Sequence, residues 1–125
     1  MTVLLIEPGK KPRKAEIEPV LEVMQEVVGG YIQAVYPFED LIALICSEEG
    51  KLLGLPLNRV LRDEEGDIFD VVAGTFFLCG ISEWGESFES LTEDQCMRYE
   101  KLFRWPEQFL NVEGQLICLI EKRNC

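Results

Sequence analysis

The first thirty residues alternate between the spacing of strands and the spacing of a helix. A short apolar run at residues 3–6 and an alternating segment at 14–18 flank the turn-rich residues 8–12, which predicts a β-hairpin. Apolar residues then recur at helical spacing over 20–28. A proline precedes this segment and the pair of glycines at 29–30 follows it, so the pattern predicts a helix with a defined start and stop.

The middle of the chain mixes β-type runs with one helix-like segment. Residues 31–36 and 41–46 predict two further strands that pair with each other. Apolar residues at 57–61 have a spacing that predicts one or two helical turns, and the acidic run 63–67 predicts an exposed loop. Residues 71–79 are the most β-like stretch, and the glycine inside it predicts a bulge or a close approach to the backbone.

The last third predicts a capped helix followed by a strand. Thr92 and Gln95 have the spacing of a capping box, and the helix that they begin ends before Trp105-Pro106. Residues 115–121 predict the final strand. The order of elements predicts one domain over residues 1–125, of the α+β class, with a mainly antiparallel sheet and two principal helices packed against it.

Composition narrows the class of protein. Hydrophobic residues make up 47% of the chain and charged residues 28%, which is a globular balance. No apolar run approaches the roughly 20 residues of a membrane-spanning helix, and the first residues do not resemble a secretory signal. The five cysteines form no CxxC pair, which indicates reduced thiols. We therefore expect a cytoplasmic protein without a membrane partner.

Charge and the lack of histidine exclude several functions. The net charge of −11 comes from 12 basic and 23 acidic residues. Such a field repels nucleic-acid phosphates and attracts basic protein surfaces, so direct nucleic-acid binding is not expected. Without histidine, Cys–His and Ser–His–Asp nucleophilic mechanisms are excluded.

Polar residues concentrate just before the acidic run. On a short helix, Arg59 and Arg62 share one face, where two guanidinium groups suit a phosphate or a carboxylate. Asn58 would contact a base or cap the turn. The alternative is structural: Asn58 caps the helix while the arginines neutralise Asp63 and its acidic neighbours.

The same region raises the question of a metal site. Its carboxylates lack the alternating ligands and central glycine of an EF-hand loop, so we expect neither a metal nor a cofactor. An enzyme is less favoured than a binding protein. If the protein were an enzyme, we would expect a metal-dependent hydrolase with Asp63, Asp67 and Asp70 in its active site. Elsewhere, Trp84, Phe88, Trp105 and Phe109 flank the last helix and are interpreted as satellite core, with a pocket cover or a partner contact as the alternative.

Four sequence blocks together carry a resemblance to a known family. They are VLLIEPGKKPR, VVGGYIQAVYPFED, GLPLNRVLRDEEGDIFDVVAGTFFLCG and FESLTEDQCMRYEKLF. The chain closely resembles, over residues 2–104, a domain-of-unknown-function family found in bacteriophages, plasmids and their Gram-positive hosts. The tail at 105–125 is longer than the family pattern, and the family provides no catalytic residues to transfer.

The resemblance implies a small accessory protein of a mobile element that blunts host defence. In the favoured hypothesis it is a non-catalytic sponge, which sequesters a nucleotide-derived signal of host immunity. Homo-oligomers would help to form its pocket. In the alternative, the acidic surface mimics nucleic acid and occupies the groove of a host nuclease or restriction enzyme. The residues assigned to the pocket of the sponge are Asn58, Arg59, Arg62, Asp63, Gly74 and Thr75. We favour the sponge because it gives these residues a common role in binding one ligand.

Overall fold

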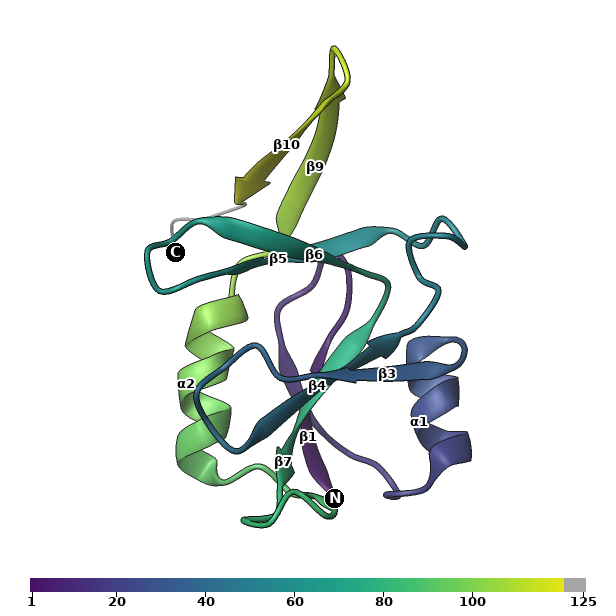
Figure 1. Cartoon of the computed structure of the whole chain (residues 1–125), viewed down its shortest axis with the longest axis vertical. Helices are drawn as coiled ribbons and strands as arrows, with labels where there is room; N and C mark the ends of the chain where they lie inside the picture. The colour runs from purple at the N-terminus through teal and green to yellow at the C-terminus, as the bar shows by residue number, and fades with distance from the viewer. Residues whose placement is uncertain (121–125) are drawn as a thin grey trace.

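The computed structural model describes residues 1–120, and this part of the chain forms two helices and ten strands (Figure 1). The α+β class and the predominance of antiparallel strands are confirmed. The helices are α1 (Leu21–Val28) and α2 (Glu93–Phe103). The strands are β1 (Thr2–Ile6), β2 (Arg13–Glu16), β3 (Ile32–Val35), β4 (Ile42–Ser47), β5 (Leu57–Arg62), β6 (Ile68–Ala73), β7 (Phe76–Ile81), β8 (Phe88–Glu89), β9 (Glu107–Val112) and β10 (Gln115–Ile120).

The strands form one main sheet and two hairpins. The main sheet is antiparallel, with the order β2-β1-β7-β4-β3, and β8 pairs with β7. The hairpins are β5–β6 and β9–β10, each a two-stranded sheet of its own. In Figure 1, β5–β6 lies across one end of the main sheet, and β9–β10 projects beyond it.

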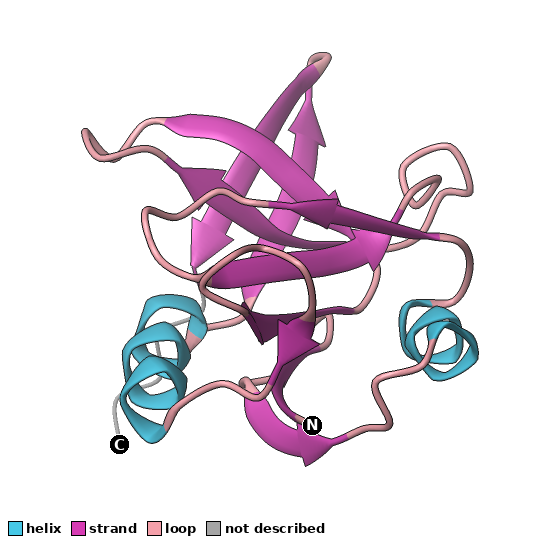
Figure 2. Cartoon of the chain, turned by 60° about the horizontal axis from the view of Figure 1, so that its bottom comes forward, coloured by secondary structure: helices cyan, strands magenta, loops and turns pink. Residues whose placement is uncertain are grey.

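Apolar clusters cover both faces of the main sheet. Consecutive side chains of a strand point to opposite faces, so Val3 and Leu4 belong to different clusters, as do Phe77 and Phe76. Burial on both faces explains why the central strands β4 and β7 are continuous apolar runs. Residues of α1 join one cluster, and residues of α2 and of the β5–β6 hairpin join the other. The two helices lie on opposite sides of the strands (Figure 2).

The helix boundaries follow the predicted signals. α1 stops at Gly29, whose φ of 80° is left-handed and whose N–H donates to the Gln25 carbonyl oxygen at 2.8 Å. At the start of α2, the Thr92 hydroxyl accepts from the Gln95 N–H at 3.1 Å, and the Gln95 side chain accepts from the Thr92 N–H at 3.0 Å. The predicted capping box is confirmed.

The helical prediction for residues 57–61 is wrong. This segment is strand β5, paired with β6, and the register jumps from Leu57 opposite Ala73 to Arg59 opposite Val72. Asn58 is therefore the extra residue of a β-bulge. The apolar spacing imitates a helix because the bulge breaks the two-residue period of the strand.

The predicted strand at 71–79 is two strands joined by a sharp turn. β6 ends at Ala73, and Gly74 follows with a φ of 82°. A Cβ at Gly74 would lie 2.8 Å from Cδ1 of Leu55, so both the backbone angle and the space require glycine. The chain can then turn back into the main sheet as β7.

The C-terminal hairpin contains one strand that the sequence did not reveal. β9 precedes a two-residue turn, Glu113-Gly114, in which both residues have positive φ, as tight hairpins require. The predicted strand at 115–121 matches β10 as far as Ile120. Glu121 lies outside the described residues.

Candidate functional site

Asn58 and Arg59 form a fully buried polar network rather than an open site. The Asn58 side-chain amide donates to the carbonyl oxygens of Ile6 and Gly74, each at 2.9 Å. Its amide oxygen accepts from Nη1 of Arg59 at 2.8 Å. The bulge in β5 turns both neighbouring side chains inward, and neither has any solvent exposure.

The guanidinium of Arg59 links three segments of the chain. Nε and Nη2 donate to the carbonyl oxygen of Phe103 at 3.2 and 3.0 Å, and Nη2 also donates to that of Lys10 at 2.6 Å. Phe103 is the last residue of α2, so the cation also lies at the negative end of the helix dipole. The remaining bonds, from Nη1, go to Asn58. Arg59 therefore holds the β1–β2 loop, β5 and α2 together.

Glu107, from β9, is the counterion of this network. Its carboxylate lies 4.0 Å from Nε of Arg59 and accepts from the Val60 N–H at 3.1 Å and from the Cys118 thiol at 2.9 Å. Burial lowers the pKa of Arg59, and the Glu107 carboxylate opposes that change. For Cys118, burial and then the same carboxylate raise the thiol pKa to about 12, so the thiol is protonated at neutral pH.

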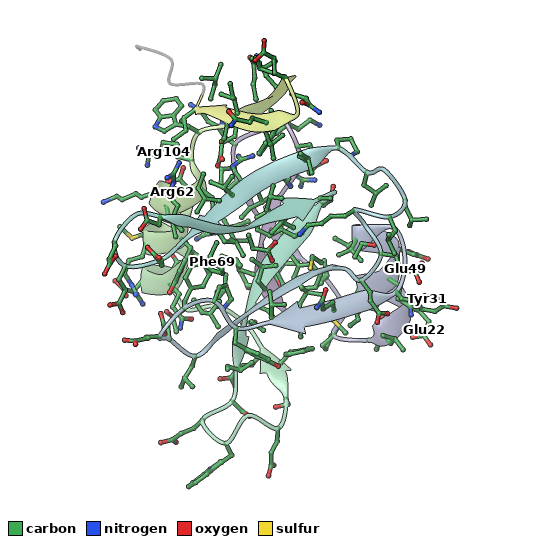
Figure 3. All side chains as sticks on the ribbon, turned by 45° about the horizontal axis from the view of Figure 1, so that its top comes forward. Glu22, Tyr31, Glu49, Arg62, Phe69 and Arg104 are labelled. Carbon is green, nitrogen blue, oxygen red and sulfur yellow. The ribbon has the colours of Figure 1, made fainter. Side chains whose placement is uncertain are left out.

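The other residues of the predicted pocket lie elsewhere. Arg62 is the last residue of β5, and Asp63 begins the exposed β5–β6 turn. Nη1 of Arg62 donates to the Gly66 carbonyl oxygen at 2.9 Å. Figure 3 labels Arg62. Asp63 accepts the backbone N–H groups of Glu65 and Asp67, which closes the turn on itself. The expectation that Arg59 and Arg62 project from one helical face is therefore wrong, because β5 is a strand.

Gly74 and Thr75, the last two residues of the predicted pocket, follow β6. Gly74 packs against Leu55, and its carbonyl oxygen accepts from Asn58. Thr75 is half-buried and precedes β7. Gly74 is therefore part of the buried hydrogen-bond network of Asn58 and Arg59. Groups of the chain itself accept the hydrogen bonds that a ligand was expected to accept.

A different cavity separates the main sheet from the β5–β6 hairpin. This interlayer cleft has a volume of about 410 Å³. Val35, Leu61, Val71 and Val72 contribute apolar walls. Its polar lining residues are Gln33, Ser47, Glu48, Lys51 and Asp70.

An ion pair spans the interlayer cleft from one wall to the other. Nζ of Lys51, in the loop after β4, lies 2.6 Å from Oδ1 of Asp70 in β6. Burial acts to raise the pKa of Asp70, but the hydrogen bonds from Lys51 and the Val71 N–H outweigh it and lower the pKa. Both side chains are about half exposed, at 56% and 49%, so solvent or a ligand can reach them.

Ser47 contributes a buried hydroxyl without a partner among the described residues. Its Oγ lies on the opposite side of β4 from Cys46, and a Cβ on Gly30 would lie 3.6 Å from it. Besides the cleft, Ser47 borders a shallower hollow of about 290 Å³ with Tyr31, Glu49 and Leu53. Figure 3 shows Tyr31 and Glu49 on the same side of the molecule. No sequence pattern singles out Ser47 or Lys51, and Asp70 was predicted only as part of a hydrolase site.

The structure provides three further findings, on metal ligands, on aromatic residues and on membrane-spanning helices. Over residues 1–120, no group of three or more Cys, Asp or Glu side chains is placed to hold a metal ion. Trp84 is 82% exposed, so its assignment to the core is wrong, whereas Phe88 packs against the cluster that contains α1. None of the helices in the described chain has the length and apolar character to cross a bilayer.

The comparison with protein families identifies the chain. A family model described as a domain of unknown function, DUF3846, matches residues 1–104. The protein belongs to this family. No curated protein and no solved structure matches the chain. The DUF3846 match ends one residue after α2, so Arg59 lies inside the matched region and its counterion Glu107 lies outside it.

Proposed function

We propose that this DUF3846 protein is a non-catalytic accessory protein of a phage or another mobile element, acting in the cytoplasm of the host bacterium. It binds and sequesters a nucleotide-derived small molecule of host immunity in the interlayer cleft. The observation that carries the proposal is the Lys51–Asp70 pair across a cleft of about 410 Å³. Sites for small ligands commonly measure roughly 300–1,000 Å³.

The ion pair can exchange its partners for a ligand. An exposed pair contributes at most about 1 kcal/mol, so little free energy is lost when it opens. The Lys51 ammonium then binds an anionic oxygen of the ligand, and the Asp70 carboxylate accepts from hydroxyl groups such as those of a ribose. The apolar walls at Val35 and Val71 accommodate the flat face of a base.

The charges of the cleft limit the ligand class. Lys51 is the one cation among the described lining residues, whereas Glu48 and Asp70 both line the same cleft. A single phosphate is matched by one ammonium, but a triphosphate would meet two carboxylates. The proposal therefore favours ligands with one phosphate over polyphosphates.

The proposal is tested by calorimetric titration of the full chain with AMP, GMP, CMP and UMP, together with native mass spectrometry of protein purified from phage-infected cells. Lys51→Met should weaken binding at least tenfold, about 1.4 kcal/mol. Lys14→Met is the matched control, because Lys14 forms an equally short 2.6 Å pair with Glu93 outside the cleft. Equal binding by the two variants would exclude the cleft as the site.

A second candidate function is an acidic inhibitor that occupies the nucleic-acid groove of a host nuclease. The observation in its favour is Trp84, which is 82% exposed in the loop before β8. Glu83, Glu86 and Glu89, close to it in the sequence, are also exposed. Exposed aromatic residues inside a charged rim are typical of protein interfaces. The net charge of −11 would attract the inhibitor to the basic groove of a nuclease.

Mutation distinguishes nucleotide sequestration from nuclease inhibition. Replacing Glu83, Glu86 and Glu89 with lysine should abolish the protection of DNA against cleavage in a host-cell extract and leave nucleotide binding intact. Raising the salt concentration should weaken that protection steeply, because exposed charges are screened. Undiminished protection by the triple variant would remove the inhibitor from consideration.

A further inference from the structure

The hollow of about 290 Å³ that Ser47 borders lies at the C-terminal end of α1. Its walls come from the last turn of the helix, from the two residues before β3 and from the loop after β4. This α1-end hollow is lined by Gln25, Gly30, Tyr31, Ser47, Glu49 and Leu53. It is distinct from the interlayer cleft, which is closed by the β5–β6 hairpin.

Ser47 directs a buried hydroxyl toward the α1-end hollow. The residue is 7% exposed, and its Oγ has no hydrogen-bond partner in the part of the chain that the structure describes. Cys46 lines the interlayer cleft, and neighbouring side chains of a strand alternate, so the Ser47 hydroxyl points away from the cleft and toward Gly30. A buried hydroxyl without a partner is unfavourable, so a ligand that bonds to it gains affinity from that contact.

The rim of the α1-end hollow allows a ligand to reach this hydroxyl. Tyr31 and Leu53 are 68% and 58% exposed. Exposed side chains change rotamer on the picosecond to nanosecond timescale. The two side chains can therefore rearrange around a small ligand without a change in the backbone.

The charges of the α1-end hollow attract cations. Glu49 supplies a carboxylate, and none of the described lining residues is basic. The last carbonyl groups of a helix carry partial negative charge, and residues 25–28 of α1 include no basic side chain that would neutralise it. Glu22 precedes Gln25 by three residues and so shares its face of α1, which adds a second exposed carboxylate on this side of the molecule (Figure 3).

The other lining groups fit an ammonium group on an aliphatic chain. An ammonium has three hydrogen-bond donors and no acceptor, so it can donate to both Glu49 and Ser47. The aromatic ring of Tyr31 attracts a cation to its face. Leu53 offers an apolar contact for methylene groups. An inorganic cation would make no use of these two apolar contacts.

We propose that the α1-end hollow is a binding site for a linear polyamine. One ammonium group lies in the hollow, where it donates to Glu49 and Ser47. The aliphatic chain then passes over Leu53, and a second ammonium group pairs with Glu22. A lysine side chain of a partner protein has a single ammonium group and would pair with only one of the two carboxylates, so the free polyamine is the better match.

The test is calorimetric titration of the full chain with spermidine in about 150 mM NaCl, where diffuse attraction to an acidic surface is screened. The wild type should bind one spermidine per chain. Glu49→Gln should weaken binding about tenfold, because a charge-assisted hydrogen bond is lost. Tyr31→Leu should weaken it about threefold, as the loss of a cation–π contact predicts.

Two matched controls lie at the other end of β3. Tyr36 is 60% exposed just after the strand, and Glu39 is exposed in the β3–β4 loop. Neither residue lines the α1-end hollow. Tyr36→Leu and Glu39→Gln remove the same groups as the test variants and should bind spermidine like the wild type.

Ser47→Ala tests the floor of the site. Since the hydroxyl has no partner among the described residues, its removal should not lower stability, but it should weaken spermidine binding about fivefold. Binding by Ser47→Ala as tight as that of the wild type would exclude the α1-end hollow as the site.

A lysine peptide distinguishes the source of the ammonium group. The peptide acetyl-Gly-Lys-Gly-amide should bind about tenfold more weakly than spermidine, because it lacks the second ammonium group. Equal affinity for the peptide would overturn the polyamine in favour of a basic partner protein. The proposal is also overturned if the wild type does not bind spermidine at this salt concentration, or if Glu49→Gln binds it as tightly as Glu39→Gln does.

Discussion

Asn58 and Arg59 are neighbours in the chain, and the amide oxygen of the first accepts from the guanidinium of the second at 2.8 Å inside the protein. Neighbouring side chains of a regular strand point to opposite faces. The bulge in β5 directs both inward, where their donors meet the carbonyl oxygens of Ile6, Lys10 and Phe103. The Asn-Arg pair of this protein is therefore a structural element.

The two arginines of β5 should differ sharply in their contribution to stability. Removing one partner of a buried ion pair leaves an uncompensated charge, so Arg59→Met should lower the free energy of unfolding by about 3–5 kcal/mol. Arg62→Met should change it by less than about 1 kcal/mol, because Arg62 is exposed and donates to Gly66 in the adjoining turn. Urea denaturation followed by circular dichroism measures both. Similar small losses would contradict the structural role of Arg59.

Gly74→Ala should destabilise the protein through both backbone and space. A left-handed φ costs a non-glycine residue about 1–2 kcal/mol, and the new Cβ would also meet Leu55. Gly9→Ala is the control, because Gly9 has a φ of 75° but, apart from its chain neighbours, no atom of the described residues lies within 4 Å of its Cβ position. The difference in unfolding free energy between the two variants isolates the steric part. Adding Leu55→Ala should reduce the clash, and an equal cost at Gly9 and Gly74 would show that none exists.

Ser47→Ala should leave the unfolding free energy unchanged or raise it. The Ser47 hydroxyl is buried without a partner among the described residues, and a group in that state costs about 1–3 kcal/mol. Thr92→Ala removes a hydroxyl that caps α2 and should cost about 1 kcal/mol. Thermal unfolding of the two variants compares them directly. A loss at Ser47 as large as that at Thr92 would mean that its hydroxyl has a stabilising partner.

Acid should weaken the contact between the β3–β4 loop and α2. The Asp40 carboxylate accepts from the Leu41 N–H at 2.8 Å, from Arg98 at 3.0 Å, from the Tyr99 hydroxyl at 3.1 Å and from Gln95 at 3.3 Å. Burial alone would raise the pKa of Asp40, but these donors lower it below the ordinary 3.8. Because the folded pKa is lowered, the contribution to stability is complete above the unfolded pKa and is lost as the pH falls through the folded value.

Asp40→Asn isolates this effect. The variant should show a smaller decrease in melting temperature than the wild type between about pH 5 and pH 2, because it has no proton to take up at this position. Tyr99→Phe keeps the carboxylate but removes one donor, so its acid transition should begin at a higher pH. Parallel curves for wild type and Asp40→Asn would show that Asp40 does not contribute to acid sensitivity.

Local signals in the sequence predicted most elements of the main sheet and both helices. The glycine stop of α1 and the capping box of α2 depend on bonds between residues at most five positions apart, so they can be recognised without knowledge of the fold. The continuous apolar runs of β4 and β7 are equally direct, since strands buried on both faces need no polar positions.

The candidate site was less predictable because its geometry depends on distant partners. The role of Arg59 depends on two carbonyl oxygens more than 40 residues away along the chain and on a bulge that the local spacing does not reveal. Likewise, the interlayer cleft exists because the β5–β6 hairpin lies beside β4, which places Lys51 opposite Asp70. Neither residue has a distinctive sequence context.

The Arg59 network also bears on the order in which the chain folds and opens. Its bonds to Phe103 and Lys10 span 44 and 49 residues, and the Asn58 bond to Ile6 spans 52. Each bond forms only after a long loop has closed, and closing such loops is entropically costly. We expect the network to assemble after the folding transition state, so its loss would accelerate unfolding more than it slows folding. One buried side chain would then set the lifetime of the native state.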